Sequence, residues 1–212
     1  MLPLQIQDSY DILTREEGEM VKKKVNPNKI PLSDGKLDVN KITEAATDKS
    51  TLIAWAEILG ALADFSEMRT EKLQQLWTDT NKAAGRTHRQ EDVEHWVSKI
   101  EEIAEIELPY TGASLADVHT KGELNRAIRK IERKSLVFAY SIIGQQFVEK
   151  ELLPLKDVGR VFQKADSLDK EITDGRITLN DLLEMLRDEF GLVLATSNTG
   201  VKLVRYIQEE KK

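Results

Sequence analysis

The chain of 212 residues contains no cysteine, which excludes disulfide bonds, thiolate metal sites and cysteine nucleophiles. It is also poor in aromatic residues (6%), in glycine (11 residues) and in proline (5 residues), a composition that disfavours a sheet-rich or loop-rich fold. Its most apolar stretch, Leu136–Ile143, is far too short to span a bilayer. Met1–Gln5 lacks a basic segment followed by an apolar run, so we expect no signal peptide, no membrane partner and a cytoplasmic location. A virion protein or a protein exported by a non-classical route would show the same pattern.

An excess of positive charge is missing as well. The formal net charge is −6, which argues against a protein whose whole surface binds nucleic acid, because phosphate binding requires a basic field. The chain has no Gly-rich phosphate loop, no nucleophile elbow and no His-Glu-x-x-His segment. We therefore expect no enzymatic activity, no catalytic residues and no cofactor apart from the calcium considered below.

The residues that are abundant favour helices. Hydrophobic residues make up 40% of the chain and charged residues 32%, which suits a folded protein with a core, and Glu, Lys, Leu, Ala and Ile dominate. No set of alternating segments predicts a sheet. The sequence predicts an all-α fold, a compact bundle of about seven to eight helices that forms a single domain over residues 1–212.

The expected order of elements is as follows. We predict a first helix-loop-helix repeat over residues 14–48, central long helices over 50–151, a second repeat over 154–191 and a C-terminal helix over 197–210. In the central part, a helix capped by Ser50 or Thr51 is expected to reach Ala84, largely buried in its first half, with Glu57 on its polar arc. Two capping boxes, Thr87–Gln90 and Thr178–Asp181, indicate further helix starts, and Leu155–Lys164 reads as helical.

The two repeats share a segment that occurs 140 residues apart. Val21–Asp48 aligns without gaps to Val161–Asp188, with 7 identities in 28 positions, including Asp34-Gly35 against Asp174-Gly175. An internal repeat of this kind indicates a duplicated structural unit. Asp-Gly favours a tight turn, and Asp38 or Thr178 is a good N-cap for the helix that follows. We interpret the repeat mainly as a turn followed by a helix cap.

An Asp-Gly pair followed by an aliphatic residue, a capping residue and a helix resembles the second half of an EF-hand loop. That resemblance implies a calcium site in the second repeat, with ligands from Asp166, Asp169, Asp174 and Asp181. The sequence departs from the family pattern because the interval from Asp166 to Asp181 is four residues too long. In the first copy Lys41 occupies the last ligand position, where it cannot bind a cation. The duplicated segments are also similar to those of tellurite-resistance-type helical domains.

A basic cluster is the main candidate for partner binding. Arg126, Arg129, Lys130, Arg133 and Lys134 oppose the apolar stripe of their helix, so we expect them to be exposed together. They would dock an acidic protein partner or nucleic acid, although no aromatic residue stands between them to stack on bases. The pattern also fits a solvated helix face. Trp77 is the tryptophan that we expect to serve an interface.

Two histidines and an aspartate form the last candidate group. His88, Asp92 and His95 have the spacing of one helical face, which suits a transition metal or an ordinary polar surface.

Taken together, the sequence favours a non-catalytic protein-binding protein such as an adaptor, inhibitor or assembly component. The alternatives are a calcium-binding regulatory protein that uses the second repeat loop and a nucleic-acid-associated protein that uses the Arg126–Lys134 face.

Overall fold

A computed structural model describes residues 39–63, 65, 71–86, 88–110, 115, 118, 120–197 and 200–205. Its elements are α2 (Val39–Leu62), α3 (Glu71–Ala84), α4 (Gln90–Ala104), α5 (Lys121–Glu149), α6 (Leu155–Thr173), α7 (Leu179–Phe190), β1 (Leu192–Ser197) and β2 (Gly200–Arg205). These residues form a helical bundle, which confirms the all-α class in its coarse form. The first repeat's helix and loop, residues 14–38, lie outside the described residues, so the duplication and the count of seven to eight helices stay predictions.

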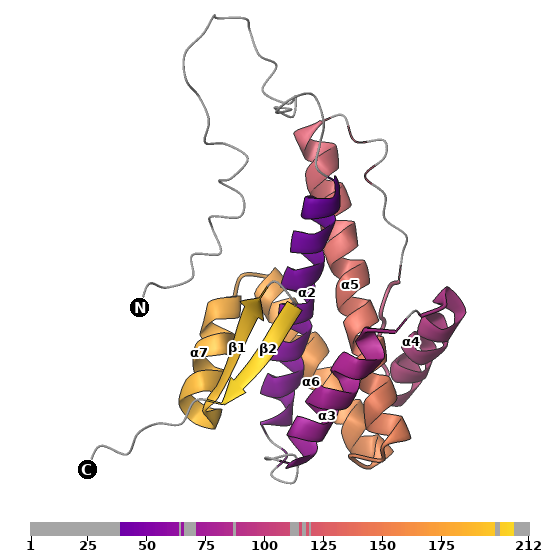
Figure 1. Cartoon of the computed structure of the whole chain (residues 1–212), viewed down its shortest axis with the longest axis vertical. Helices are drawn as coiled ribbons and strands as arrows, with labels where there is room; N and C mark the ends of the chain where they lie inside the picture. Colours follow the sequence, from indigo (N-terminus) through magenta and orange to yellow (C-terminus); the bar gives the residue numbers. More distant parts are fainter. Residues whose placement is uncertain are drawn as a thin grey trace, which may run out of the picture.

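The C-terminal helix expected over residues 197–210 is wrong for the part that the structure describes. Gly200–Arg205 is instead strand β2, which pairs antiparallel with β1 from Leu192 opposite Arg205 to Ser197 opposite Gly200. Val201 and Val204 are spaced as on one helix face, but β-branched residues fit a strand better than a helix once a partner strand is available. The resulting hairpin lies against α7 and α2 (Figure 1).

The boundaries of α2 differ from those predicted. One helix runs without a break from Val39 to Leu62, where two helices were expected to meet near Ser50 and Thr51. The hydroxyl of Ser50 donates to the carbonyl of Ala46 at 2.8 Å, and that of Thr51 to Thr47 at 2.9 Å. Because these hydroxyls bond backward into the preceding turn, they do not cap a new helix start. The helix predicted to reach Ala84 is therefore two, α2 and α3.

α4 packs on the core through one apolar face, whereas the start of α4 and that of α5 differ from the predicted caps. Val93, Val97, Ile100 and Ala104 are spaced along that face and are buried. α4 begins at Gln90 with Arg89 as its N-cap and without a side-chain cap, and Thr87, the first residue of the predicted box, lies outside the described residues. A box that sequence reading missed starts α5 instead, where Thr120 and Glu123 bond each other's backbone N–H groups.

The second repeat is a helical hairpin with a short turn. α6 extends to Thr173 and not only to Lys164, because Leu168 and Ile172 continue its apolar stripe onto the core. Gly175 follows with a φ of +71°, a backbone conformation that glycine adopts at little cost, so the predicted Asp-Gly turn is present. The predicted box of Thr178 and Asp181 is confirmed, and Gly191 caps the end of α7.

The core is built around α2. α2 and α5 lie side by side and run in the same direction, and α6 covers both of them (Figure 1). Large side chains from three helices fill the centre, where the rings of Tyr140 and Phe147 each meet Phe162 edge-on. Within the part of the chain that the structure describes, every helix is too short or too polar to cross a membrane.

Candidate functional site: the α2–α5–α6 pocket

A pocket of about 500 Å³ opens where α2, α5, the end of α6 and the start of α7 meet. We call it the α2–α5–α6 pocket. Its floor is apolar and consists of Ile53 from α2, Leu136 from α5, Ile172 from α6 and Leu179 from α7. Leu136 belongs to the core, and the other three are half-buried against it. A concave apolar surface with a few polar groups at its edge is the usual form of a binding site.

Two ion pairs connect the helices that wall the pocket. The Lys49 ammonium of α2 lies 2.8 Å from the Glu132 carboxylate of α5. The Arg133 guanidinium of α5 lies 2.6 Å from the Asp169 carboxylate of α6. Both pairs are partly shielded from water, which strengthens them relative to fully exposed pairs. They compensate four of the five charged side chains that line the pocket.

The fifth charge, on Arg129, is left over. Arg129 is exposed on α5 at the pocket's edge and makes no ion pair or side-chain hydrogen bond with any residue that the structure describes. A guanidinium presents a planar set of donors that suits a carboxylate. The mouth of the apolar pocket therefore carries one uncompensated positive charge.

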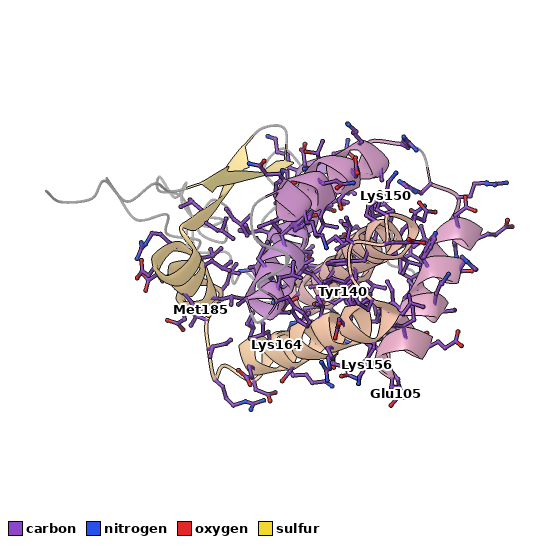
Figure 2. All side chains as sticks on the ribbon, turned by 90° about the horizontal axis from the view of Figure 1, so that it is seen from below. Glu105, Tyr140, Lys150, Lys156, Lys164 and Met185 are labelled. Atoms are coloured by element: carbon purple, nitrogen blue, oxygen red, sulfur yellow. The ribbon has the colours of Figure 1, made fainter. Side chains whose placement is uncertain are left out.

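Beneath the pocket lies a buried polar pair. Glu57 and Tyr140 stand one helical turn beyond Ile53 and Leu136 on α2 and α5. Glu57 is 0% exposed, and the Tyr140 hydroxyl donates to its Oε2 at 2.5 Å. The other oxygen, Oε1, has no hydrogen-bond partner among the described residues. Figure 2 shows Tyr140 in the middle of the helices, with the labelled Lys150 and Lys156 at their periphery.

Burial controls the protonation of this pair. Burial is the main cause, the negative charge of Asp169 adds to it, and Tyr140 and Arg133 oppose it, so that together they raise the pKa of Glu57 to about 9. The pKa of Tyr140 is raised well above its ordinary value, again mainly by burial. Glu57 is therefore a neutral carboxylic acid at pH 7. Arg133 and Asp169 belong to the pocket wall and act electrostatically on Glu57, so pocket and buried pair are electrostatically linked.

Sequence reading placed Glu57 on a polar arc, and this prediction is wrong because its side chain is in the core. A signal was present in the sequence, since Glu57 is the only charged residue between Leu52 and Ala63. A single acid within such an apolar run must either face water or be buried with a partner. The partner, Tyr140, is 83 residues away, and its position depends on the packing of α5 against α2.

The predicted basic cluster does not act as one surface. Arg126, Arg129 and Lys130 are exposed, in line with the prediction. Arg133 and Lys134 are half-buried: Arg133 pairs with Asp169, and the Lys134 ammonium lies 5.2 Å from the centre of the Tyr110 ring. The cluster is thus divided into three exposed side chains, of which Arg126 bonds the carbonyl of Gly122, and two half-buried side chains that contact other elements.

Trp77 packs against the core. Its ring centroid is 4.3 Å from that of Trp55, with the two planes inclined by 44°. The side chain is half-buried against the core, and its role at an interface stays a prediction.

The four aspartates of the predicted calcium site have separate partners. Asp166 pairs with Lys170 and Asp169 with Arg133, and both aspartates lie within α6. Asp174 pairs with Arg176, and Asp181 accepts the backbone N–H of Thr178, which lowers the pKa of Asp181. Within the described ranges, no three His, Asp or Glu side chains are grouped to hold a metal ion.

His88, Asp92 and His95 do not share one helical face, because His88 precedes the first residue of α4. All three nevertheless line a second pocket, between α3, α4 and α5.

Comparison of the chain with protein-family models, with curated proteins and with solved structures finds no match. The geometry of the two pockets is therefore the basis for assigning a function.

Proposed function

We propose that this protein is a non-catalytic binding protein, an adaptor, inhibitor or assembly component, and that its α2–α5–α6 pocket receives a short segment of another protein. The segment would place an apolar side chain on the floor of the pocket and a carboxylate on Arg129. The observation that carries this proposal is the single uncompensated guanidinium at the mouth of an apolar pocket whose other charges are paired.

The paired charges support a rigid, prepared site. Lys49–Glu132 and Arg133–Asp169 fix α2, α5 and α6 relative to one another, so few side chains would need to be ordered when a partner binds. A volume of about 500 Å³ accommodates a few side chains and not a folded surface. A short linear segment is the partner that this shape favours.

The charge distribution favours an acidic protein segment over nucleic acid. Nucleic acid would need several cations in a row along a groove. Here Arg133 is engaged by Asp169 and Lys134 by Tyr110, which leaves three exposed cations in the basic cluster, in a chain whose net charge is −6. Glu57, the most perturbed carboxylic acid, has no exposed area from which it could reach a substrate, which supports binding over catalysis.

Selection from a random peptide display library on the full-length protein tests the proposal. We expect the enriched peptides to combine Asp or Glu with Leu, Ile or Phe within a few residues. In fluorescence anisotropy, Arg129→Glu should weaken a selected peptide by about tenfold or more, because a like charge then faces its carboxylate.

The matched control is Lys156→Glu. Lys156 is exposed near the start of α6, thirteen positions before Asp169, which is roughly 20 Å along the helix. The same change of charge there should alter the affinity by less than about twofold. Enriched peptides without acidic residues, or equal effects of the two variants, would contradict the proposed role of the pocket.

A further inference from the structure

A second pocket, of about 360 Å³, lies between α3, α4 and α5. It involves residues from Ser141 to Glu149 on α5 and the C-cap Lys150, whereas the α2–α5–α6 pocket involves residues from Arg129 to Leu136. The two pockets therefore use different stretches of the same helix and share no lining residue. An inference about the second pocket does not depend on the function proposed for the first.

The carboxamide side chain of Gln146 lines this pocket. Gln146 is only 5% exposed, and its side chain makes no hydrogen bond with any residue in the described part of the chain. Its amide atoms are not among the fully buried polar atoms that lack a partner, so they keep contact with the space inside the pocket. The amide of Gln146 is thus available to water or to another molecule inside the pocket.

Two of the three acidic side chains of the pocket are compensated by ion pairs. Asp79 pairs with Lys82 at 3.9 Å and Asp92 with Arg89 at 3.2 Å. Glu149 accepts a hydrogen bond from the Gln145 amide at 2.9 Å, and this neutral group leaves the carboxylate charge uncompensated. Arg86 and Lys150 are exposed at the pocket and form no ion pair with the described residues. The rim therefore has two unpaired cations against one uncompensated carboxylate, and this surplus of one positive charge suits an anion.

The position of His88 adds a fixed polar group. Its Nε2 lies 2.7 Å from the carbonyl oxygen of Ala83, and because a carbonyl only accepts, Nε2 carries the proton that it donates. The ring also meets Phe138 edge-on, with centroids 5.5 Å apart. These two contacts hold the imidazole in place and leave Nδ1 as its remaining polar atom.

We propose that the α3–α4–α5 pocket binds a small organic anion. Arg86 and Lys150 face its carboxylate or phosphate group, and the Gln146 carboxamide hydrogen-bonds to its body. A ligand of this class would engage the Gln146 amide and the two unpaired cations at once.

NMR titration of the full-length protein at constant ionic strength tests this site, with sodium phosphate, sodium succinate and sodium chloride as probes. The chain has three tryptophans, of which Trp96 lines the pocket while Trp55 and Trp77 pack on each other in the core. We expect phosphate or succinate to shift the Trp96 indole signal with saturation at a dissociation constant of roughly 1 mM or below. The Trp55 and Trp77 signals should not move, and chloride should have no effect.

Variants separate binding from folding. Gln146→Leu removes no hydrogen bond from the described structure, so its melting temperature should be unchanged or higher, while the affinity for the active probe falls by about fivefold or more. Lys150→Gln should weaken binding to a similar extent, and Lys156→Gln, the same change at an exposed lysine outside the pocket, should leave it unchanged. If Gln146→Leu unfolds the protein, the comparison of Lys150→Gln with Lys156→Gln tests the site instead. The proposal is overturned if no probe gives a saturable shift of Trp96, or if Lys150→Gln and Lys156→Gln bind equally well.

Discussion

Glu57 is the residue whose environment departs most from what its chemistry prefers. Its carboxyl group is fully buried and bonded through one oxygen to Tyr140. The pKa of this carboxyl is about 9 in the folded protein, against an ordinary value of 4.5. The folded state therefore retains a proton that the unfolded chain releases over this interval. The stability that the group contributes is complete below about pH 4.5 and is lost as the pH rises towards 9.

Replacing Glu57 by Gln tests this directly. Glutamine has nearly the same shape and cannot ionise, so Glu57→Gln should remove a pH dependence that the wild-type protein shows. Between pH 5 and pH 8 the wild type should lose roughly 3 kcal/mol of unfolding free energy relative to the variant, measured by urea denaturation.

Glu102→Gln is the matched control for Glu57→Gln. It makes the same change at an exposed carboxylate of α4, and its pH profile should run parallel to that of the wild type. A neutral Glu57 is ruled out if the Glu57→Gln profile is also parallel to that of the wild type.

The elements were predictable where local signals decide them. The apolar stripe of α4 and the Thr178–Asp181 box follow from spacing and capping chemistry within one turn, and the structure has both. The continuity of α2 through Ser50 and Thr51 was not predictable in this way. A Ser or Thr hydroxyl can cap a new helix, or it can bond the carbonyl four residues earlier in a continuous helix, as Ser50 and Thr51 do. The choice between the two depends on how the residues before and after Ser50 pack on other helices.

α6 can approach α4 closely because residue 159 of α6 is a glycine. A Cβ added at Gly159 would lie 2.5 Å from the backbone carbonyl oxygen of Ile103. Because backbone cannot rotate out of the way as a side chain can, Gly159→Ala should destabilise the protein by about 1–3 kcal/mol. Gly122→Ala is the control, because a Cβ in this first turn of α5 would meet no described atom closer than 4.0 Å. In urea titrations of both variants, Gly122→Ala should be neutral or slightly stabilising. Equal effects would show that α4 and α6 are farther apart than described.

The capping box of α7 makes a second prediction for the elements. Thr178→Ala removes the oxygen that accepts the N–H of Asp181 at 3.2 Å, so it should cost roughly 1 kcal/mol. Thr78→Ala makes the same change at an exposed position within α3, where alanine is the better helix former. Thermal unfolding should therefore separate the two variants in opposite directions. A Thr178→Ala protein as stable as Thr78→Ala would mean that the box does not hold the start of α7.

At the scale of the whole molecule, α5 is the element that both pockets share. Its earlier stretch packs on α2 and α6 around the α2–α5–α6 pocket, and its later stretch meets α3 and α4 around the other. Sequence reading found Arg129 as a candidate because a basic face is a local pattern. It did not find Glu57, Asp169 as a partner of Arg133, or Gln146. Their roles depend on which helices meet, which the spacing of residues along one helix does not determine.

The claim central to this account is that Arg129 receives a carboxylate of a partner segment at the mouth of the α2–α5–α6 pocket. A charge exchange tests it most directly. The affinity of a selected acidic peptide is measured for the wild type and for Arg129→Glu, and then again with the peptide's acidic residue replaced by Lys. The account predicts that the Lys peptide loses about tenfold or more in affinity for the wild type and regains most of it on Arg129→Glu. If the losses of affinity caused by Arg129→Glu and by the Lys peptide simply add, and the Lys peptide binds Arg129→Glu no better than the wild type, the claim is contradicted.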